Sequence, residues 1–269
     1  MLSVRAFIDE SDTREPKMKD IFSMGGWVAD VETWERFSDD WQSVLKINPS
    51  IEYFKHNEAK STSGQFEGWS KLAVNAKLCS LARVVDRHID PIKHHYGVLT
   101  GIKPEGLRIL FQKSTATARQ VRSILKLASE YDFCFHAIIA MTTQRQALFS
   151  DPPVDFIFDT HSNLKKCTHF YEELKKGIPD WLARVAGTVT SGDDKVLMPL
   201  QAADLLVGQV TTNIKTGATE EPFKILARGG RILFDPLKWN ETPLLSGYGS
   251  VLELFNETWI RMMAERPKK

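Results

Sequence analysis

Strand and helix patterns alternate along residues 154–214, and this alternation constrains the fold more than any other feature of the chain. The run VDFIFD, which ends at Asp159, and the run LARVAGTVTSG are typical of strands, and each precedes a segment with apolar residues at helical spacing. The second helical segment carries Pro199 in its first turn, where proline is tolerated. Strands that alternate with helices indicate an α/β sheet.

The first hundred residues contain further strand and helix patterns. Apolar spacing predicts strands at 3–9 and 20–30, a helix at 31–47, a short strand at 51–54, a helix at 65–89 and a strand at 93–100. The first two strands follow one another directly, and the second contains the pair Gly25 and Gly26. We expect them to form an antiparallel pair with a long connection.

The remaining patterns determine the expected domain organisation. Residues from about 104 to 150 are mostly helical in pattern, and no internal repeat or low-complexity linker divides the chain. The simplest organisation is one α/β domain over residues 1–215 that carries this helical insertion. A C-terminal extension over 216–269 would pack on the same domain. A division into two domains is the alternative.

Composition excludes several classes of protein. The chain has 35 basic and 34 acidic residues, so its formal net charge of +1 produces no general field toward nucleic acid or a membrane surface. Its three cysteines form no Cys-x-x-Cys pair, which favours reduced thiols in a cytoplasm over disulfides or a zinc site. We find no signal-peptide pattern and no apolar run near the roughly 20 residues that span a bilayer. We therefore expect a cytoplasmic protein without a membrane partner.

Three acidic residues stand where an apolar pattern would not place them. Asp9 and Asp159 each end a predicted strand, and Asp204 lies inside the apolar helical run PLQAADLLVG. A turn explains Asp9 equally well, and a helix cap explains Asp159 equally well. Capping does not apply to Asp204 in mid-helix, where aspartate is unfavourable, although the residue can still lie at a solvated rim.

The three carboxylates have a common explanation if the two strands are neighbours and the late helix crosses their ends. They would then converge at one edge of the sheet, in the arrangement that Mg²⁺ or Mn²⁺ requires. Two such ions about 4 Å apart activate water and stabilise the leaving oxygen in phosphoryl transfer. Glu10 follows Asp9 directly, so it would face the other side of the sheet and act as a further metal ligand only if the chain turns there.

Four sequence features together resemble the domain-of-unknown-function family 3800. They are the strand ending FIDES, the glycine-containing second strand, the strand ending FIFD and the late run PLQAADLLVG. The late run is the most specific, because Gln201, Ala203, Asp204 and Gly208 all match the family pattern. The family usually has glycine after FIDES, whereas this chain has Asp12. The resemblance covers most of the chain, from Val4 to about residue 213.

The resemblance implies a ribonuclease H-like fold, a mixed sheet flanked by helices, with Asp9, Asp159 and Asp204 as catalytic metal ligands. It also implies a further acidic residue, for which the segment IEYFKHNEAKS offers Glu52 and Glu58. The sequence does not choose between these two, and both are also explained as ordinary surface residues.

For other residues near these motifs, the sequence leaves a functional and a structural role open. Lys55 is a candidate phosphate contact, and His56 or Glu58 is a candidate for proton transfer. His161 can act as a base beside the metal site, although an ordinary loop histidine explains it as well. Asp193 and Asp194 can approach the same edge from a loop, but a solvated polar turn is the preferred interpretation of SGDDK.

The leading functional prediction is a Mg²⁺- or Mn²⁺-dependent nuclease that hydrolyses phosphodiester bonds in RNA or DNA through an aspartate-rich centre. The alternative is a non-catalytic or partner-activated module of a prokaryotic defence system that binds nucleic acid or protein. The near-neutral net charge supports this alternative, because a nuclease that acts alone commonly has a basic groove. A metal-dependent phosphatase that acts on nucleotides is a third reading of the same carboxylates.

Overall fold

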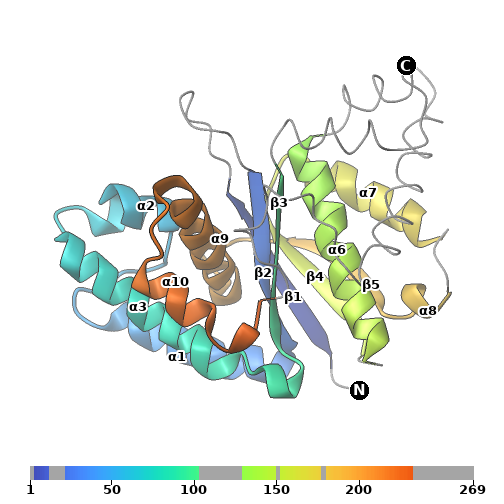
Figure 1. Ribbon diagram of the computed structural model, residues 1–269, viewed down its shortest axis with the longest axis horizontal. Coiled ribbons are helices and arrows are strands. Elements are labelled where there is room, and N and C mark those ends of the chain that lie inside the picture. Colours follow the sequence, from blue (N-terminus) through green and yellow to red (C-terminus); the bar gives the residue numbers. More distant parts are fainter. Residues whose placement is uncertain (1–2, 12–21, 103–128, 150–151, 177–179, 233–269) are drawn as a thin grey trace.

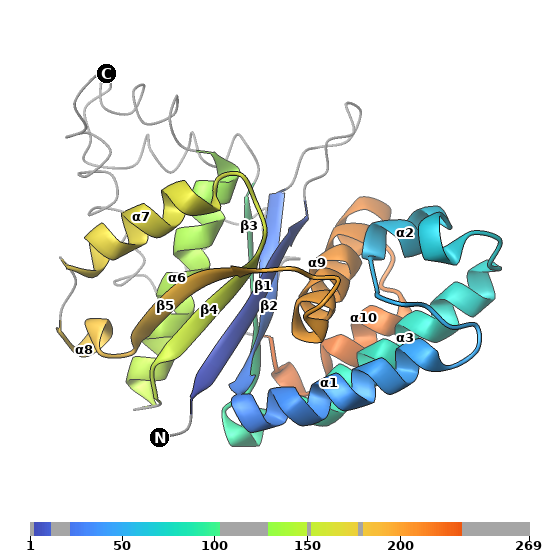
Figure 2. The same ribbon diagram turned by 180° about the vertical axis from the view of Figure 1, so that it is seen from behind.

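A mixed five-stranded sheet forms the centre of the protein, and helices cover both of its faces (Figures 1 and 2). The computed structural model describes residues 3–11, 22–102, 129–149, 152–176 and 180–232. The strands are β1 (Val4–Ser11), β2 (Phe22–Asp30), β3 (Tyr96–Ile102), β4 (Val154–Asp159) and β5 (Ala186–Gly192). The predicted α/β class is therefore confirmed.

The strands follow the order β3-β2-β1-β4-β5. β1, β2 and β3 are antiparallel neighbours, as expected for the first two, whereas β4 is parallel to β1 and β5 is parallel to β4. In the central strand Ile8 pairs with Gly26 on one side and with Phe158 on the other. The carboxyl ends of β1, β4 and β5 consequently meet at one edge of the sheet.

The helices form a layer on each face. One layer contains α1 (Val31–Lys46), α2 (His56–Ser61), α3 (Lys71–His88), α9 (Met198–Thr216) and α10 (Glu221–Leu226); the other contains α6 (Glu130–Leu148), α7 (Leu164–Lys175) and α8 (Asp180–Ala183) (Figure 1). Polar side chains cap the N-termini of several of these helices. Asp30 and Ser70 accept hydrogen bonds from the first turns of α1 and α3, and Ser129 forms a capping box with Asp132 in α6.

Alternation along the strands divides the buried side chains between two cores. In β1, Phe7 packs with the aromatic residues of α1, whereas Ala6 and Ile8 pack on the opposite face with Phe156 and Phe158 of β4. Both faces of the central strand are thus buried, as is usual for strands covered by helices on both sides. Asp9 follows the same alternation and lies on the face of Phe7, toward α9.

Helix α9 is the buried element that connects the first layer to the sheet. Every residue from Pro199 to Asn213 is buried, although the helix contains several polar side chains. Trp27 of β2 donates its indole N–H to the carbonyl of Ala202 over 3.1 Å, and Ser23 hydrogen-bonds Thr211 over 3.2 Å. These bonds, together with apolar packing on β1 and β2, fix the helix across the edge where the parallel strands end.

Several predicted elements differ from the structure. Residues 51–54 form no strand, because their backbone bends toward α9 instead of pairing with a neighbour. The helix predicted over 65–89 begins only at Lys71, because Gly68 adopts a left-handed φ of 78° and Ser70 caps the new helix. His94 and His95 precede β3 rather than lying within it.

Two predicted segments extend beyond the described residues. Most of the helical insertion at about 104–150 lies outside them, and its described part is α6, which packs on β2 and β3. The described part of the C-terminal extension contains α10, which packs on α3, and it ends at Ile232. Within the described ranges, no helix has both the length and the apolar character that crossing a membrane requires.

We predict that Gly26→Ala destabilises the sheet. A Cβ atom at this position would lie 1.8 Å from the backbone oxygen of Phe7, so the β1–β2 pair would have to separate. The expected loss in the free energy of unfolding is about 2–3 kcal/mol, measured by urea denaturation. Asn75→Ala, at an exposed position of α3, should change it by less than about 0.5 kcal/mol. Equal stability of the two variants would contradict the close approach of these strands.

Candidate functional site

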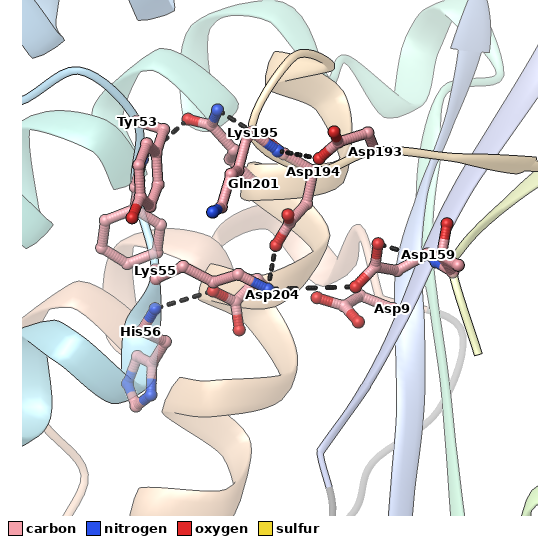
Figure 3. A network of polar contacts seen from close by, with 12 residues as sticks. Asp9, Tyr53, Lys55, His56, Asp159, Asp193, Asp194, Lys195, Gln201 and Asp204 are labelled. Atoms are coloured by element: carbon pink, nitrogen blue, oxygen red, sulfur yellow. Dashed lines mark hydrogen bonds and ion pairs between the residues drawn. The ribbon is translucent and has the colours of Figure 1, made fainter. Parts of the chain in front are cut away.

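Asp9 and Asp159 lie side by side at the carboxyl ends of β1 and β4 (Figure 3). The two parallel strands pair as far as Ile8 and Phe158, and the aspartates are the next residue of each strand. Both side chains therefore point to the same face of the sheet, toward α9. The two strands are neighbours, which meets the condition under which the sequence predicted convergence of these carboxylates.

Asp204 completes the predicted set from α9. Its carboxylate accepts a hydrogen bond of 2.7 Å from the backbone N–H of His56, and its side chain is buried rather than exposed at a rim. Figure 3 shows Asp204 close to Asp9 and Asp159, and the negative charges of Asp204 and Asp159 raise the pKa of Asp9. The structure thus brings together the three residues that the sequence singled out.

Asp194 is a fourth carboxylate at this edge. It follows β5, the third parallel strand that ends here, and its side chain is buried. It forms an ion pair with Lys55, and its charge acts on Asp159 and Asp204. The preferred sequence interpretation of a solvated turn is therefore wrong for Asp194. It holds for the neighbouring Asp193, which is exposed and accepts a hydrogen bond from the backbone N–H of Lys195.

Lys55 places its ammonium group among the carboxylates. Besides its ion pair with Asp194, Nζ lies 3.9 Å from a carboxylate oxygen of Asp159 (Figure 3). Burial alone would lower the pKa of Lys55, but the bond to Asp194 and the charges of Asp204 and Asp9 outweigh it and raise the pKa above its ordinary value. The lysine is therefore charged and serves as the counter-ion of the cluster.

Burial and mutual repulsion raise the pKa values of Asp9 and Asp204 in the cluster. Burial raises the pKa of Asp9 well above its ordinary value, and the charges of Asp204, Glu10 and Asp159 add to this shift. Burial also raises the pKa of Asp204 to about 7, against the hydrogen bond from His56 and the charge of Lys55. Like charges held together out of water favour binding of a proton or another cation.

Gln201 connects the backbone around the site. Its side-chain oxygen accepts hydrogen bonds from the Trp41 indole over 2.9 Å and from the backbone N–H of Phe54 over 3.1 Å. Its amide nitrogen donates to the carbonyl of Asp194 over 2.8 Å. One buried side chain of α9 therefore holds both the segment that carries Lys55 and the loop that carries Asp194.

Gly208 provides space for the ring of His56 one turn further along α9. A Cβ atom at Gly208 would lie 2.1 Å from that ring. Burial and, to a lesser extent, the charge of Lys60 lower the pKa of His56 to about 4, so the imidazole is neutral. Figure 3 shows the ring turned away from the carboxylates, so His56 contributes its backbone N–H to the site and not its imidazole.

Two predicted site residues lie on the opposite face of the sheet. Glu10 points away from Asp9, toward the side of Ala6 and Ile8. The ring of His161 stacks on Tyr131 of α6 with ring centroids 4.1 Å apart, and its Nδ1 accepts a hydrogen bond from Asn163. The structure does not bring Glu10 or His161 together with Asp204.

The candidates in the segment before and within α2 have other contacts. Glu58 accepts hydrogen bonds from the Tyr53 hydroxyl over 3.2 Å and from the backbone N–H of Gln65 over 3.1 Å. Glu52 is exposed, and its backbone N–H bonds the side chain of Gln65. Neither carboxylate is a contact of Lys55, so the fourth acid of the cluster is Asp194 and not a residue of this segment.

The donor chemistry of the cluster fits a hard divalent cation. All four side chains provide carboxylate oxygens, which suit Mg²⁺ or Mn²⁺ better than softer metals. Over the described residues, no group of three or more His, Cys, Asp or Glu side chains is spaced to hold one ion directly. In this arrangement the ammonium of Lys55 instead offsets part of the negative charge.

Comparison with known proteins adds no relative. No protein-family model matches the chain, and no curated protein matches it. The resemblance to family 3800 therefore stays a prediction that depends on the quoted motifs.

Two contributions to the site had weak sequence signals. Asp159 is the last residue of β4, and Asp194 comes two residues after the end of β5, so the position of SGDDK at the end of a predicted strand was the available signal. Gln201 lies in the run that resembles the family pattern. Its bonds connect the segment of Phe54 with the loop of Asp194, and these two segments are far apart in sequence. No local pattern indicates such a connection.

We predict that ionisation of Asp204 destabilises the metal-free protein as the pH rises from about 4 to about 7. The pKa of Asp204 is about 7 in the folded protein against an ordinary 3.8, so between these values the folded state holds a proton that the unfolded state releases. Asp204→Asn keeps the acceptor for His56 and removes the contribution of Asp204 to the pH dependence. At about pH 8 it should be more stable than the native protein by on the order of 1–3 kcal/mol.

Urea denaturation between about pH 5 and pH 8, with a chelator present, measures this effect. Asp193→Asn is the matched control, because its side chain is exposed and should leave the pH dependence unchanged. An Asp204→Asn protein that is less stable than the native chain at the higher pH would contradict the burial of like charges.

We also predict that Gln201→Met lowers stability by on the order of 2–4 kcal/mol, because it leaves the N–H groups of Trp41 and Phe54 buried without their acceptor. Gln209→Met is the control within the same helix, since Gln209 makes a single longer contact of 3.3 Å with His56. Its expected cost is about 1 kcal/mol. Equal losses in the two variants would show that Gln201 is not the connecting residue.

Proposed function

We propose that the protein is a divalent-metal-dependent phosphodiesterase that cleaves nucleic acid at the four-carboxylate cluster of Asp9, Asp159, Asp194 and Asp204. One observation carries this proposal: the ends of three neighbouring parallel strands and one buried helix bring four carboxylates together, of which Asp9, Asp194 and Asp204 are buried and Asp159 is half-buried. The mutual repulsion of these carboxylates lowers the stability of the folded protein. Clusters of this kind are typical of functional sites, where function is retained at a cost in stability.

The proposal includes a ribonuclease H-like fold and membership of family 3800. It is supported by the mixed sheet, by the parallel pairing of the strands that end in FIDES and FIFD, and by the packing of the PLQAADLLVG helix on β1 and β2. Gln201, Asp204 and Gly208, which carry the motif, all have contacts with the segment around Lys55. These contacts give a physical reason for the spacing of the motif.

The residues of the chain would have distinct roles in this reaction. Asp9, Asp159, Asp194 and Asp204 would hold Mg²⁺ or Mn²⁺, which when bound supplies Lewis acidity for phosphoryl transfer. The backbone N–H of His56 orients the carboxylate of Asp204. Lys55 offers a positive charge for a phosphate oxygen of the substrate. Glu10 and His161, on the other face, have no role in the proposed reaction.

Two neighbouring residues favour nucleic acid over a mononucleotide. The ammonium of Lys195 lies 5.2 Å from the ring centroid of Tyr53, and both residues lie beside the cluster (Figure 3). A lysine and an aromatic ring can bind a backbone phosphate and a base of an extended strand. A substrate of one nucleotide would not need this additional surface.

We predict that Asp194→Asn lowers metal-stimulated cleavage by about a hundredfold or more, whereas Asp193→Asn retains most of it. The two aspartates are adjacent in sequence, but only Asp194 is buried in the cluster. Asp9→Asn and Asp204→Asn should lose activity to a similar extent. Cleavage of labelled single-stranded and duplex RNA and DNA with Mg²⁺, Mn²⁺ or a chelator provides the measurement.

Full activity in Asp9→Asn or Asp204→Asn would refute the assignment. Equal losses in Asp193→Asn and Asp194→Asn would refute the role of Asp194. Binding of Mn²⁺ without cleavage of any of these substrates would favour the partner-activated module, and hydrolysis of mononucleotides alone would favour a phosphatase.

A further inference from the structure

The ammonium of Lys55 lies among the carboxylates of the cluster (Figure 3). It pairs with Asp194, lies 3.9 Å from Asp159, and is acted on by the charges of Asp204 and Asp9. A divalent cation held by these carboxylates would be repelled by an ammonium at the same place. The lysine and the metal therefore compete for one position.

The backbone of Lys55 is anchored on both sides to α9. The preceding N–H, of Phe54, donates to Gln201 over 3.1 Å, and the following N–H, of His56, donates to Asp204 over 2.7 Å. His56 is also packed against Gly208 and cannot shift toward the helix. The main chain at Lys55 is consequently fixed, and any movement of its charge must come from the side chain.

The side chain of Lys55 has the freedom to make this movement. It is 32% exposed, whereas the side chain of Asp194 is 7% exposed, so the lysine reaches the cluster from its open side. Its four-carbon stem turns about several single bonds, and its ammonium is easily hydrated. Moving the ammonium of Lys55 into solvent therefore requires a smaller rearrangement than moving a buried carboxylate into solvent would.

We propose that Lys55 is a built-in competitor for the divalent cation: its ammonium offsets part of the negative charge of the cluster when no metal is bound, and metal binding displaces the ammonium toward solvent. This inference depends on the proposed metal-dependent function. Because the backbone stays anchored beside Asp204, the displaced ammonium remains next to the cluster and becomes available to a phosphate oxygen. The same residue would thus lower the affinity for metal and bind the substrate after metal has entered.

Chemical labelling of the native protein tests the displacement without any substitution. An ion-paired lysine reacts slowly with acetic anhydride, because the reagent attacks the neutral amine. Addition of Mn²⁺ should raise the rate of acetylation of Lys55 several-fold, as measured by mass spectrometry of digested protein. Lys195, which is exposed nearby and pairs with none of the four carboxylates, is the internal control and should keep its rate.

Metal affinity tests the competition. Lys55→Met removes the competing charge and should bind Mn²⁺ about tenfold or more tightly than the native protein in calorimetric titration without substrate. Lys195→Met removes one positive charge from an exposed position outside the cluster and should change the affinity for Mn²⁺ by less than about threefold. Lys55→Arg restores a positive charge and should bind less tightly than Lys55→Met. Lys55→Gln replaces Lys55→Met if the latter does not fold.

The outcomes separate this inference from the proposed function. If the native protein binds Mn²⁺, but removal of Lys55 leaves the affinity unchanged or weaker, or the labelling rate does not rise, the competition is refuted and the metal site stands. An equal gain in Mn²⁺ affinity in Lys55→Met and Lys195→Met would show that the effect comes from net charge alone, and would also refute the competition. If neither the native protein nor Lys55→Met binds Mn²⁺ at millimolar concentration, the metal-dependent function itself is refuted.

Discussion

The enclosure of four carboxylates around one ammonium group is the interaction on which the arrangement of this protein depends. Asp9, Asp159 and Asp194 come from strand ends, and Asp204 comes from the middle of a buried helix. Asp9, Asp194 and Asp204 are buried and Asp159 is half-buried, and the charge of Lys55 and hydrogen bonds offset part of the repulsion among them. Such a cluster persists because the surrounding packing is strong enough to hold it.

The surrounding packing comes mainly from α9 and the two cores. The helix is buried along nearly its whole length, and two of its polar side chains bind the segment around Lys55: Gln201 accepts from Phe54, and Asp204 accepts from His56. Because these partners lie on neighbouring residues, the helix and the segment of Lys55 form one unit. The parallel strands bring their acids to the same edge, which is where open α/β sheets commonly bind ligands.

The sequence predicted much of this arrangement from local patterns. Period-two and helical spacing identified the α/β sheet, the antiparallel first pair and the late helix, and the acids out of pattern identified Asp9, Asp159 and Asp204. The strand predicted at 51–54 was wrong, because the backbone N–H of Phe54 bonds Gln201 of α9 and the segment pairs with no described strand. Asp194 was read as solvated, because burial of a turn depends on which elements pack over it.

The sequence by itself determined which residues form strands and helices and which carboxylates stand at their ends, since these follow from the spacing of apolar side chains over a few residues. Only the tertiary structure decided which acids meet. The alternation of β1 places Glu10 opposite Asp9, and the packing of α6 places His161 against Tyr131, away from Asp204. The pairing of β4 with β5 and the bonds of Gln201 bring Asp194 and Lys55 together. The bond between Gln201 and Phe54 and the ion pair between Lys55 and Asp194 each join residues over a hundred positions apart, and local spacing carries no information about them.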